Sequence, residues 1–80
     1  MKLPRDLDAP TLIRALRRVG YEVERQTGSH VRLRHELPDV PPITIPNHRP
    51  LKVGTLHAIL AEVARTRGWS VARLLEELFG

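Results

Sequence analysis

The sequence predicts an α+β fold of two layers, in which helices cover one face of a three-stranded antiparallel sheet in the order α-β-β-β-α-α. Three observations support this prediction. Apolar residues recur at three- and four-residue steps in one segment near the start and in two near the end, which indicates amphipathic helices. Between them, short runs of alternating apolar and polar residues indicate strands. A Gly-Ser pair separates the first two runs, as in a hairpin.

The first helix is predicted to begin after Asp8, whose carboxylate suits an N-cap, and to end at Gly20. Its apolar stripe consists of Leu12, Ile13, Leu16 and Val19. The side chains of Arg14, Arg17 and Arg18 fall off this stripe. We interpret these arginines as a solvated face that complements the helix dipole, rather than as a binding site.

Strands are predicted at residues 21–27 and 30–35, on either side of a Gly28-Ser29 turn, and at residues 43–45. The segment 36–42 contains three prolines, which cannot donate to a strand ladder, so a loop is expected there. A meander of these strands would turn one apolar face toward the helices, made of Tyr21, Val23, Val31, Leu33, Ile43 and Ile45.

Two further helices are predicted to cover that face. Thr55 is placed to cap the first of them, which ends before Gly68, and Ser70 to cap the second. Their apolar stripes are Leu56, Ile59, Leu60 and Val63 in one helix, and Val71, Leu74, Leu75 and Leu78 in the other. Trp69 and Phe79 flank the last helix and are expected in the core.

The length and composition suit a small domain without cofactors. We expect the 80 residues, 1–80, to form a single domain. There is no cysteine, so neither a disulfide nor a thiolate metal site can supplement the core. No apolar run approaches the roughly 20 residues of a membrane-spanning helix, and the first ten residues lack the apolar stretch of a secretory signal. A cytoplasmic location with no membrane contact is therefore expected.

The charge favours an anionic partner. Thirteen basic residues against nine acidic ones give a formal net charge of +4, and all of the basic residues except Lys2 and Lys52 are arginine. Arginine forks match phosphate geometry and stack on bases, so nucleic acid is the first partner to consider. The alternative is a solvated surface rich in arginine for reasons unrelated to binding.

One predicted strand concentrates polar chemistry on a single face. Because side chains alternate along a strand, Val31, Leu33 and His35 are expected to point toward the core. The other face then presents His30 with two guanidiniums in a row, those of Arg32 and Arg34.

Four blocks of sequence occur in order at short spacings: Arg18-Val19-Gly20-Tyr21, Gln26-Thr27-Gly28-Ser29-His30, Ile43-Thr44-Ile45-Pro46-Asn47-His48, and Gly54-Thr55-Leu56 followed by Ile59-Leu60. Together they resemble the HicA toxin family, over about residues 3–78. The resemblance implies a fold like the double-stranded-RNA-binding domain, cleavage of messenger RNA as the activity in a toxin–antitoxin system, and a HicB-like antitoxin as protein partner.

The resemblance also assigns residues. The Gly-Ser-His block matches at Gly28, Ser29 and His30, so His30 takes the place of the family's catalytic histidine. Many members continue with a second histidine or an aromatic residue where this chain has Val31. The Pro-x-His block ends at His48, for which the resemblance carries over the position without a catalytic role.

The chemistry fits these assignments. Metal-free RNA cleavage needs a group that takes a proton from the 2′-hydroxyl, a group that protonates the leaving 5′-oxygen, and cations beside the phosphate. Histidine, with an ordinary pKa of about 6.5, serves as acid or base near neutrality, so His30 can fill one role. Arg32 and Arg34 would bind phosphate. Ser29 would orient the imidazole or contact the substrate, and Gly28 permits the turn and close backbone approach; His48 or water is the candidate second group.

The remaining histidines have simpler interpretations. His35 is expected to be a satisfied residue at the edge of the core, and His57 to be solvated on its helix. The histidine spacing matches no zinc motif, so no metal site and no cofactor are predicted. The alternative function is a double-stranded-RNA-binding module without catalysis, which would need arginines but no group that titrates near neutrality.

Overall fold

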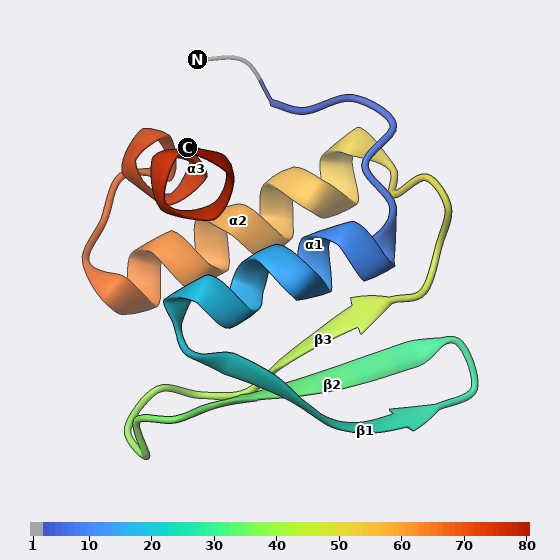
Figure 1. Cartoon of the computed structure of the whole chain (residues 1–80), viewed down its shortest axis with the longest axis horizontal. Coiled ribbons are helices and arrows are strands. Elements are labelled where there is room, and N and C mark those ends of the chain that lie inside the picture. The colour runs from blue at the N-terminus through green and yellow to red at the C-terminus, as the bar shows by residue number, and fades with distance from the viewer. Residues whose placement is uncertain (1–2) are drawn as a thin grey trace.

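The structure is a computed structural model that describes residues 3–80, so residues 1 and 2 of the predicted domain lie outside the described residues. Its elements are α1 (Ala9–Leu16), a 3-10 turn η1 (Arg17–Val19), β1 (Tyr21–Thr27), β2 (His30–His35), β3 (Ile43–Pro46), α2 (Val53–Arg67) and α3 (Val71–Phe79). The predicted order α-β-β-β-α-α is confirmed. Figure 1 shows the helices on one side of the sheet, with α3 farthest from the strands.

The sheet is an antiparallel meander with β2 in the centre. The strand order is β1-β2-β3, so β1 and β3 are its edges. Thr27 pairs with His30 across the Gly28-Ser29 turn, and His30 pairs on its other side with Pro46. The two-residue turn predicted from the sequence is therefore present, with Gly28 at a φ of +58°, as the first central residue of a type II′ turn requires.

A β-bulge interrupts β1 at Glu24. The register shifts between Val23, which pairs with Leu33, and Arg25, which pairs with Arg32. A strictly alternating strand would put Arg25 on the same face as Val23. Because the bulge inserts one extra residue, Arg25 instead shares the face of Arg32 that points away from the helices.

The core lies between the sheet and the helices. It consists of buried side chains from every helix and strand together with the loop before α2: Ala9, Leu12, Ala15, Leu16, Val19, Tyr21, Val31, Leu33, Ile45, Leu51, Leu56, Leu60, Val63, Ala64, Leu74 and Leu78. Asp8 caps α1 by accepting a hydrogen bond from the Thr11 backbone N–H at 3.0 Å, and Ser70 caps α3 in the same way through Arg73. The predicted caps at Asp8 and Ser70 are therefore confirmed.

Val23 lies on the predicted apolar face, since it pairs with the buried Leu33, but it is 41% exposed because it sits on an edge strand that the helices do not fully cover. Two other expectations about individual residues are wrong. Phe79 is 38% exposed, since it follows the buried Leu78 by one residue and thus points about 100° away from the buried stripe. Thr55 does not cap α2; the helix starts at Val53, and its exposed first turn is solvated instead of capped by a side chain.

A buried histidine ties β2 to the end of the first helical segment. The Nδ1 of His35 accepts a hydrogen bond from the Leu37 backbone N–H at 3.0 Å, so Nε2 carries the ring hydrogen and donates it to the Val19 carbonyl at 2.8 Å. The ring lies against Gly20, whose φ is +102° and where a Cβ would come within 2.6 Å of Nε2. His35 is thus the satisfied residue expected from the sequence.

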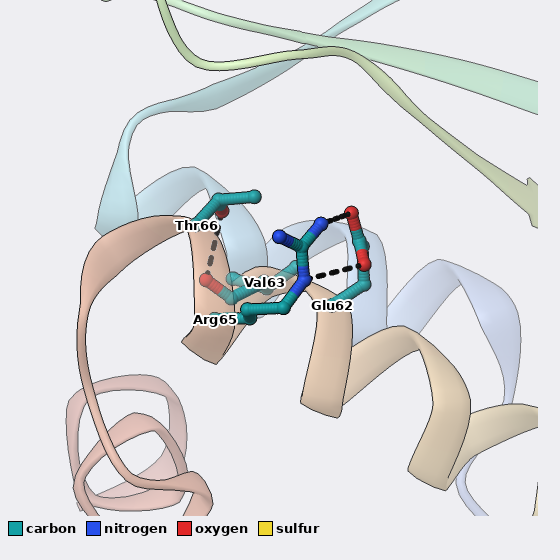
Figure 2. A network of polar contacts seen from close by, with 4 residues as sticks. All are labelled: Glu62, Val63, Arg65 and Thr66. Atoms are coloured by element: carbon teal, nitrogen blue, oxygen red, sulfur yellow. Dashed lines mark hydrogen bonds and ion pairs between the residues drawn. The ribbon is translucent and has the colours of Figure 1, made fainter.

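The C-terminal half of α2 is reinforced on its surface. Arg65 pairs with Glu62 one turn earlier, with a shortest distance of 2.6 Å, and the Thr66 hydroxyl donates to the Val63 carbonyl at 2.9 Å (Figure 2). Helix α3 then packs against α2 and η1, where Arg18 donates to the Leu78 carbonyl at 3.0 Å. Within residues 3–80, no helix is both long and apolar enough to span a bilayer.

Candidate nucleic-acid interface

His30 begins β2 and is exposed; because side chains alternate along the strand and Val31 is buried, it lies on the sheet face opposite the helices. The turn before it is fixed from a second side, because the Asn47 backbone N–H donates to the Ser29 carbonyl at 2.6 Å. This hydrogen bond ties the hairpin turn to the segment that follows β3. This holds the imidazole at one end of the open sheet face.

Arg32 and Arg34 lie on the same face as His30, as the strand alternation predicted. They share a counter-ion: Glu24 Oε1 lies 3.0 Å from Arg32 Nε, and Glu24 Oε2 lies 3.8 Å from Arg34 Nε. Both guanidiniums keep access to solvent, because the Arg32 side chain is 40% exposed and that of Arg34 is 68% exposed. In water such exposed pairs are weak, so a phosphate can compete with this carboxylate.

His30 lines a shallow hollow of about 120 Å³. The hollow is lined by His30, Arg25, Thr27, Arg32 and Thr44, which come from all three strands. The hollow thus combines one imidazole, two guanidiniums and two hydroxyls. Arg25, Thr27 and Thr44 were not predicted as site residues, because an unbroken β1 would turn Arg25 and Thr27 inward and β3 was expected to contribute only to the core.

The other predicted site residues lie at the margins. Among the described residues, the Ser29 hydroxyl makes no hydrogen bond to His30, which leaves contact with the substrate as its predicted role. His48 is exposed two residues beyond Pro46, the partner of His30, and no described contact joins the two imidazoles. His57 is exposed on α2, as expected.

Two buried side chains near the helices, Tyr21 and His35, lie away from the His30 hollow. Burial raises the pKa of the Tyr21 hydroxyl above its usual range, so it remains neutral. The Arg67 guanidinium lies 2.9 Å from Nε2 of the buried His35 ring, which is already engaged with the Val19 carbonyl. In the described part of the chain, no three His, Asp or Glu side chains gather as a metal would require.

The protein is thus a small α+β domain, and the sheet face opposite its helices carries one exposed imidazole and several guanidiniums. The family model described as "HicA toxin of bacterial toxin-antitoxin" matches residues 9–64, from the start of α1 into α2, and this range contains the His30 hairpin. The chain belongs to the HicA toxin family. No curated protein matches it, and neither does any solved structure.

Membership of the HicA family indicates the general activity of this protein. The protein is a toxin of a toxin–antitoxin system, and proteins of this family are generally ribonucleases. The family also implies an antitoxin partner and an RNA target in general terms. Helix α3, which begins at Val71, lies beyond the matched range, so these implications rest on α1, the sheet and most of α2.

Proposed function

We propose that this toxin is a metal-independent endoribonuclease that cleaves messenger RNA, with His30 as a catalytic acid or base. The observation that carries the proposal is the exposed imidazole of His30 in a hollow with Arg25 and Arg32. An exposed histidine beside cations on an open sheet face has no structural role in the core. A substrate phosphate can bind these cations in competition with the exposed carboxylate of Glu24.

The proposed reaction is a transesterification. The 2′-oxygen of one nucleotide attacks the adjacent phosphorus, the bond from phosphorus to the 5′-oxygen breaks, and the products carry a 2′,3′-cyclic phosphate and a free 5′-hydroxyl. One group accepts the 2′-hydroxyl proton, while another protonates the departing 5′-oxygen. His30 fills one of these roles, and His48 or water fills the other. Arg32 and Arg34 stabilise the charge that builds on the phosphate oxygens.

The hairpin supports this assignment in two ways. Gly28 has no neighbouring atom within 4 Å of the position its Cβ would take, so the turn leaves open space beside His30 for an RNA backbone. The exposed Ser29 adds a hydroxyl at the same place. RNA cleavage by the purified protein and by its His30→Ala variant is the direct test. A non-catalytic RNA-binding module would bind RNA in both forms and cleave it in neither.

The double substitution Arg32→Gln and Arg34→Gln is expected to weaken RNA binding to a similar extent for RNAs of any sequence. If each arginine contacts one phosphate of a single strand, the slope of log K against log salt concentration should become shallower by about 1.4. The matched control is a pair on the helices with the same loss of charge, Arg65→Gln with Arg73→Gln, referred to below as the control pair. Binding titrations at several salt concentrations measure both. An equal change in both double variants would show that only net charge matters.

An antitoxin is expected to inhibit the toxin by covering His30. An interface of standard size hides about 800 Å² on each partner, about a sixth of the 5065 Å² surface of this chain, and so can occlude the hollow and its arginines. Because a HicB-like partner and RNA would then use the same cations, Arg32→Glu should weaken binding of both by at least about tenfold.

Competition binding measures this overlap. Labelled RNA that cannot be cleaved should be displaced from the toxin as antitoxin is added. A ternary complex of toxin, RNA and antitoxin would contradict occlusion, and so would an Arg32→Glu toxin that loses RNA but binds the antitoxin with unchanged affinity.

A further inference from the structure

A second basic surface lies on the other side of β1, between that edge strand and α1. It is a groove of about 370 Å³, lined by residues of α1, η1, β1, β2 and the loop after β3. Three of them are arginines: Arg14 from α1, Arg17 from η1, and Arg49 from the loop. Arg14 and Arg17 were predicted from the sequence to lie on a solvated face.

The groove has cations but few anions to pair with them. Within residues 3–80, none of Arg14, Arg17 and Arg49 forms an ion pair. Asp8 is the acidic residue that interacts electrostatically with two of these arginines. Hydrogen bonds from Thr11 hold the pKa of the Asp8 carboxyl below its usual value, and the charges of Arg49 and Arg14 lower this pKa further. That carboxylate is engaged as the cap of α1. The groove therefore keeps a net positive charge that an external anion can neutralise.

The rest of the lining suits a nucleobase. Ile13 and the exposed Val23 provide an apolar wall, and the side-chain amides of Gln26 and Asn47 provide donors and acceptors. Amides of this kind hydrogen-bond base edges, while guanidiniums bind the flanking phosphates. The volume of the groove, about 370 Å³, exceeds the 120 Å³ of the hollow at His30.

The groove and the His30 hollow lie at the same end of the molecule. Gln26 pairs with Val31, next to His30, and the Asn47 backbone holds the Ser29 carbonyl. Figure 1 shows the β1–β2 turn and the start of α1 at this end. A strand of RNA that leaves the outer face can therefore pass the edge of β1 and enter the groove.

We propose that this groove is a nucleotide subsite, which binds a base against Val23 and the amides of Gln26 and Asn47, and the two phosphates that flank that base through Arg14 and Arg17. It extends the RNA-binding surface beyond the His30 hollow, and its place beside a scissile phosphate rests on the function proposed above. The amides make it the part of the surface that distinguishes one base from another. The outer face then supplies contacts that are independent of sequence.

The test is binding of short single-stranded 2′-O-methyl RNA, which has no free 2′-hydroxyl and so cannot be cleaved by the proposed reaction. Replacing Arg14 and Arg17 with glutamine should lower affinity by about tenfold or more and make the salt slope shallower by about 1.4 if each contacts one phosphate. The control pair on α2 and α3 should change neither quantity by as much. Replacing Gln26 with alanine should leave the salt slope unchanged but reduce the affinity difference between RNAs that differ at one base.

The outcomes separate this subsite from the proposed catalysis. Unchanged RNA affinity and salt slope in the Arg14 and Arg17 double variant would overturn the subsite, even if His30→Ala loses cleavage. If that double variant binds the antitoxin poorly but RNA normally, the groove belongs to a protein interface and the RNA subsite is again overturned. Weakened RNA binding by the groove variant would support the subsite even if His30→Ala cleaved RNA as fast as the wild type.

Discussion

Replacing His30 with alanine is expected to lower the rate of RNA cleavage by about 10²- to 10⁴-fold, the contribution typical of one positioned acid or base. The fold should survive, because the His30 side chain is exposed and is not among the residues that form the core. The backbone pairing of His30 with Thr27 and Pro46 does not depend on its side chain. Cleavage of a defined messenger RNA under single-turnover conditions measures the effect on the chemical step.

His57→Ala is the matched control, since it removes an exposed histidine from α2, outside the lining of the hollow. It should cleave RNA at the wild-type rate. A folded His30→Ala protein that cleaves as fast as this control would remove His30 from the mechanism. Binding of non-cleavable RNA by His30→Ala should stay close to that of the wild type, because the guanidiniums remain, so the loss would lie in catalysis rather than affinity.

Replacing Gly20 with alanine is expected to destabilise the fold by about 2–5 kcal/mol. Two effects add at this position: a side chain in the left-handed region, at a φ of +102°, and a Cβ within 2.6 Å of the buried His35 ring. A chain of this length has a total stability of roughly 4–12 kcal/mol, so the variant should be close to unfolding. Urea unfolding followed by circular dichroism measures the difference.

Two other glycines separate these effects. Gly68 has a φ of +69° but no neighbour near a Cβ, so Gly68→Ala should cost only the backbone strain of about 1–2 kcal/mol. Gly54 lies in the first turn of α2 with open space around it, so Gly54→Ala should be neutral or stabilise the helix by up to about 1 kcal/mol. If Gly20→Ala proves no worse than Gly68→Ala, the close packing of His35 on Gly20 is not a constraint on the fold.

Much of this fold could be predicted because its determinants are local. Asp8 and Ser70 satisfy helix N–H groups three residues ahead, and Gly28 supplies the positive φ that the hairpin needs. Each of these needs only a few neighbouring residues, so the sequence alone reveals it. The exposure of Val23 could not be predicted in this way, because it depends on how far the helices extend across the edge of the sheet.

The composition of the site was predicted only in part, and the reason is the bulge. His30, Arg32 and Arg34 follow from alternation along β2, whereas Arg25 joins them only because Glu24 is inserted in β1. A signal for this was present. Counting back from the two-residue turn in regular register would pair Val23, expected inward, with Arg34, expected outward. Two residues on opposite faces cannot pair directly, so one extra residue was needed in the hairpin.

The same bulge affects whether copies of this protein add to one another's sheets. An open edge strand is a template on which a further strand can assemble, and repeated addition leads to aggregation. In β1 the extra residue at Glu24 breaks the even spacing of backbone groups that an incoming strand would need, and the charges of Glu22 and Arg25 flank the break. A protein with an uncovered sheet face and a free edge thereby keeps both available for its ligands while resisting self-assembly.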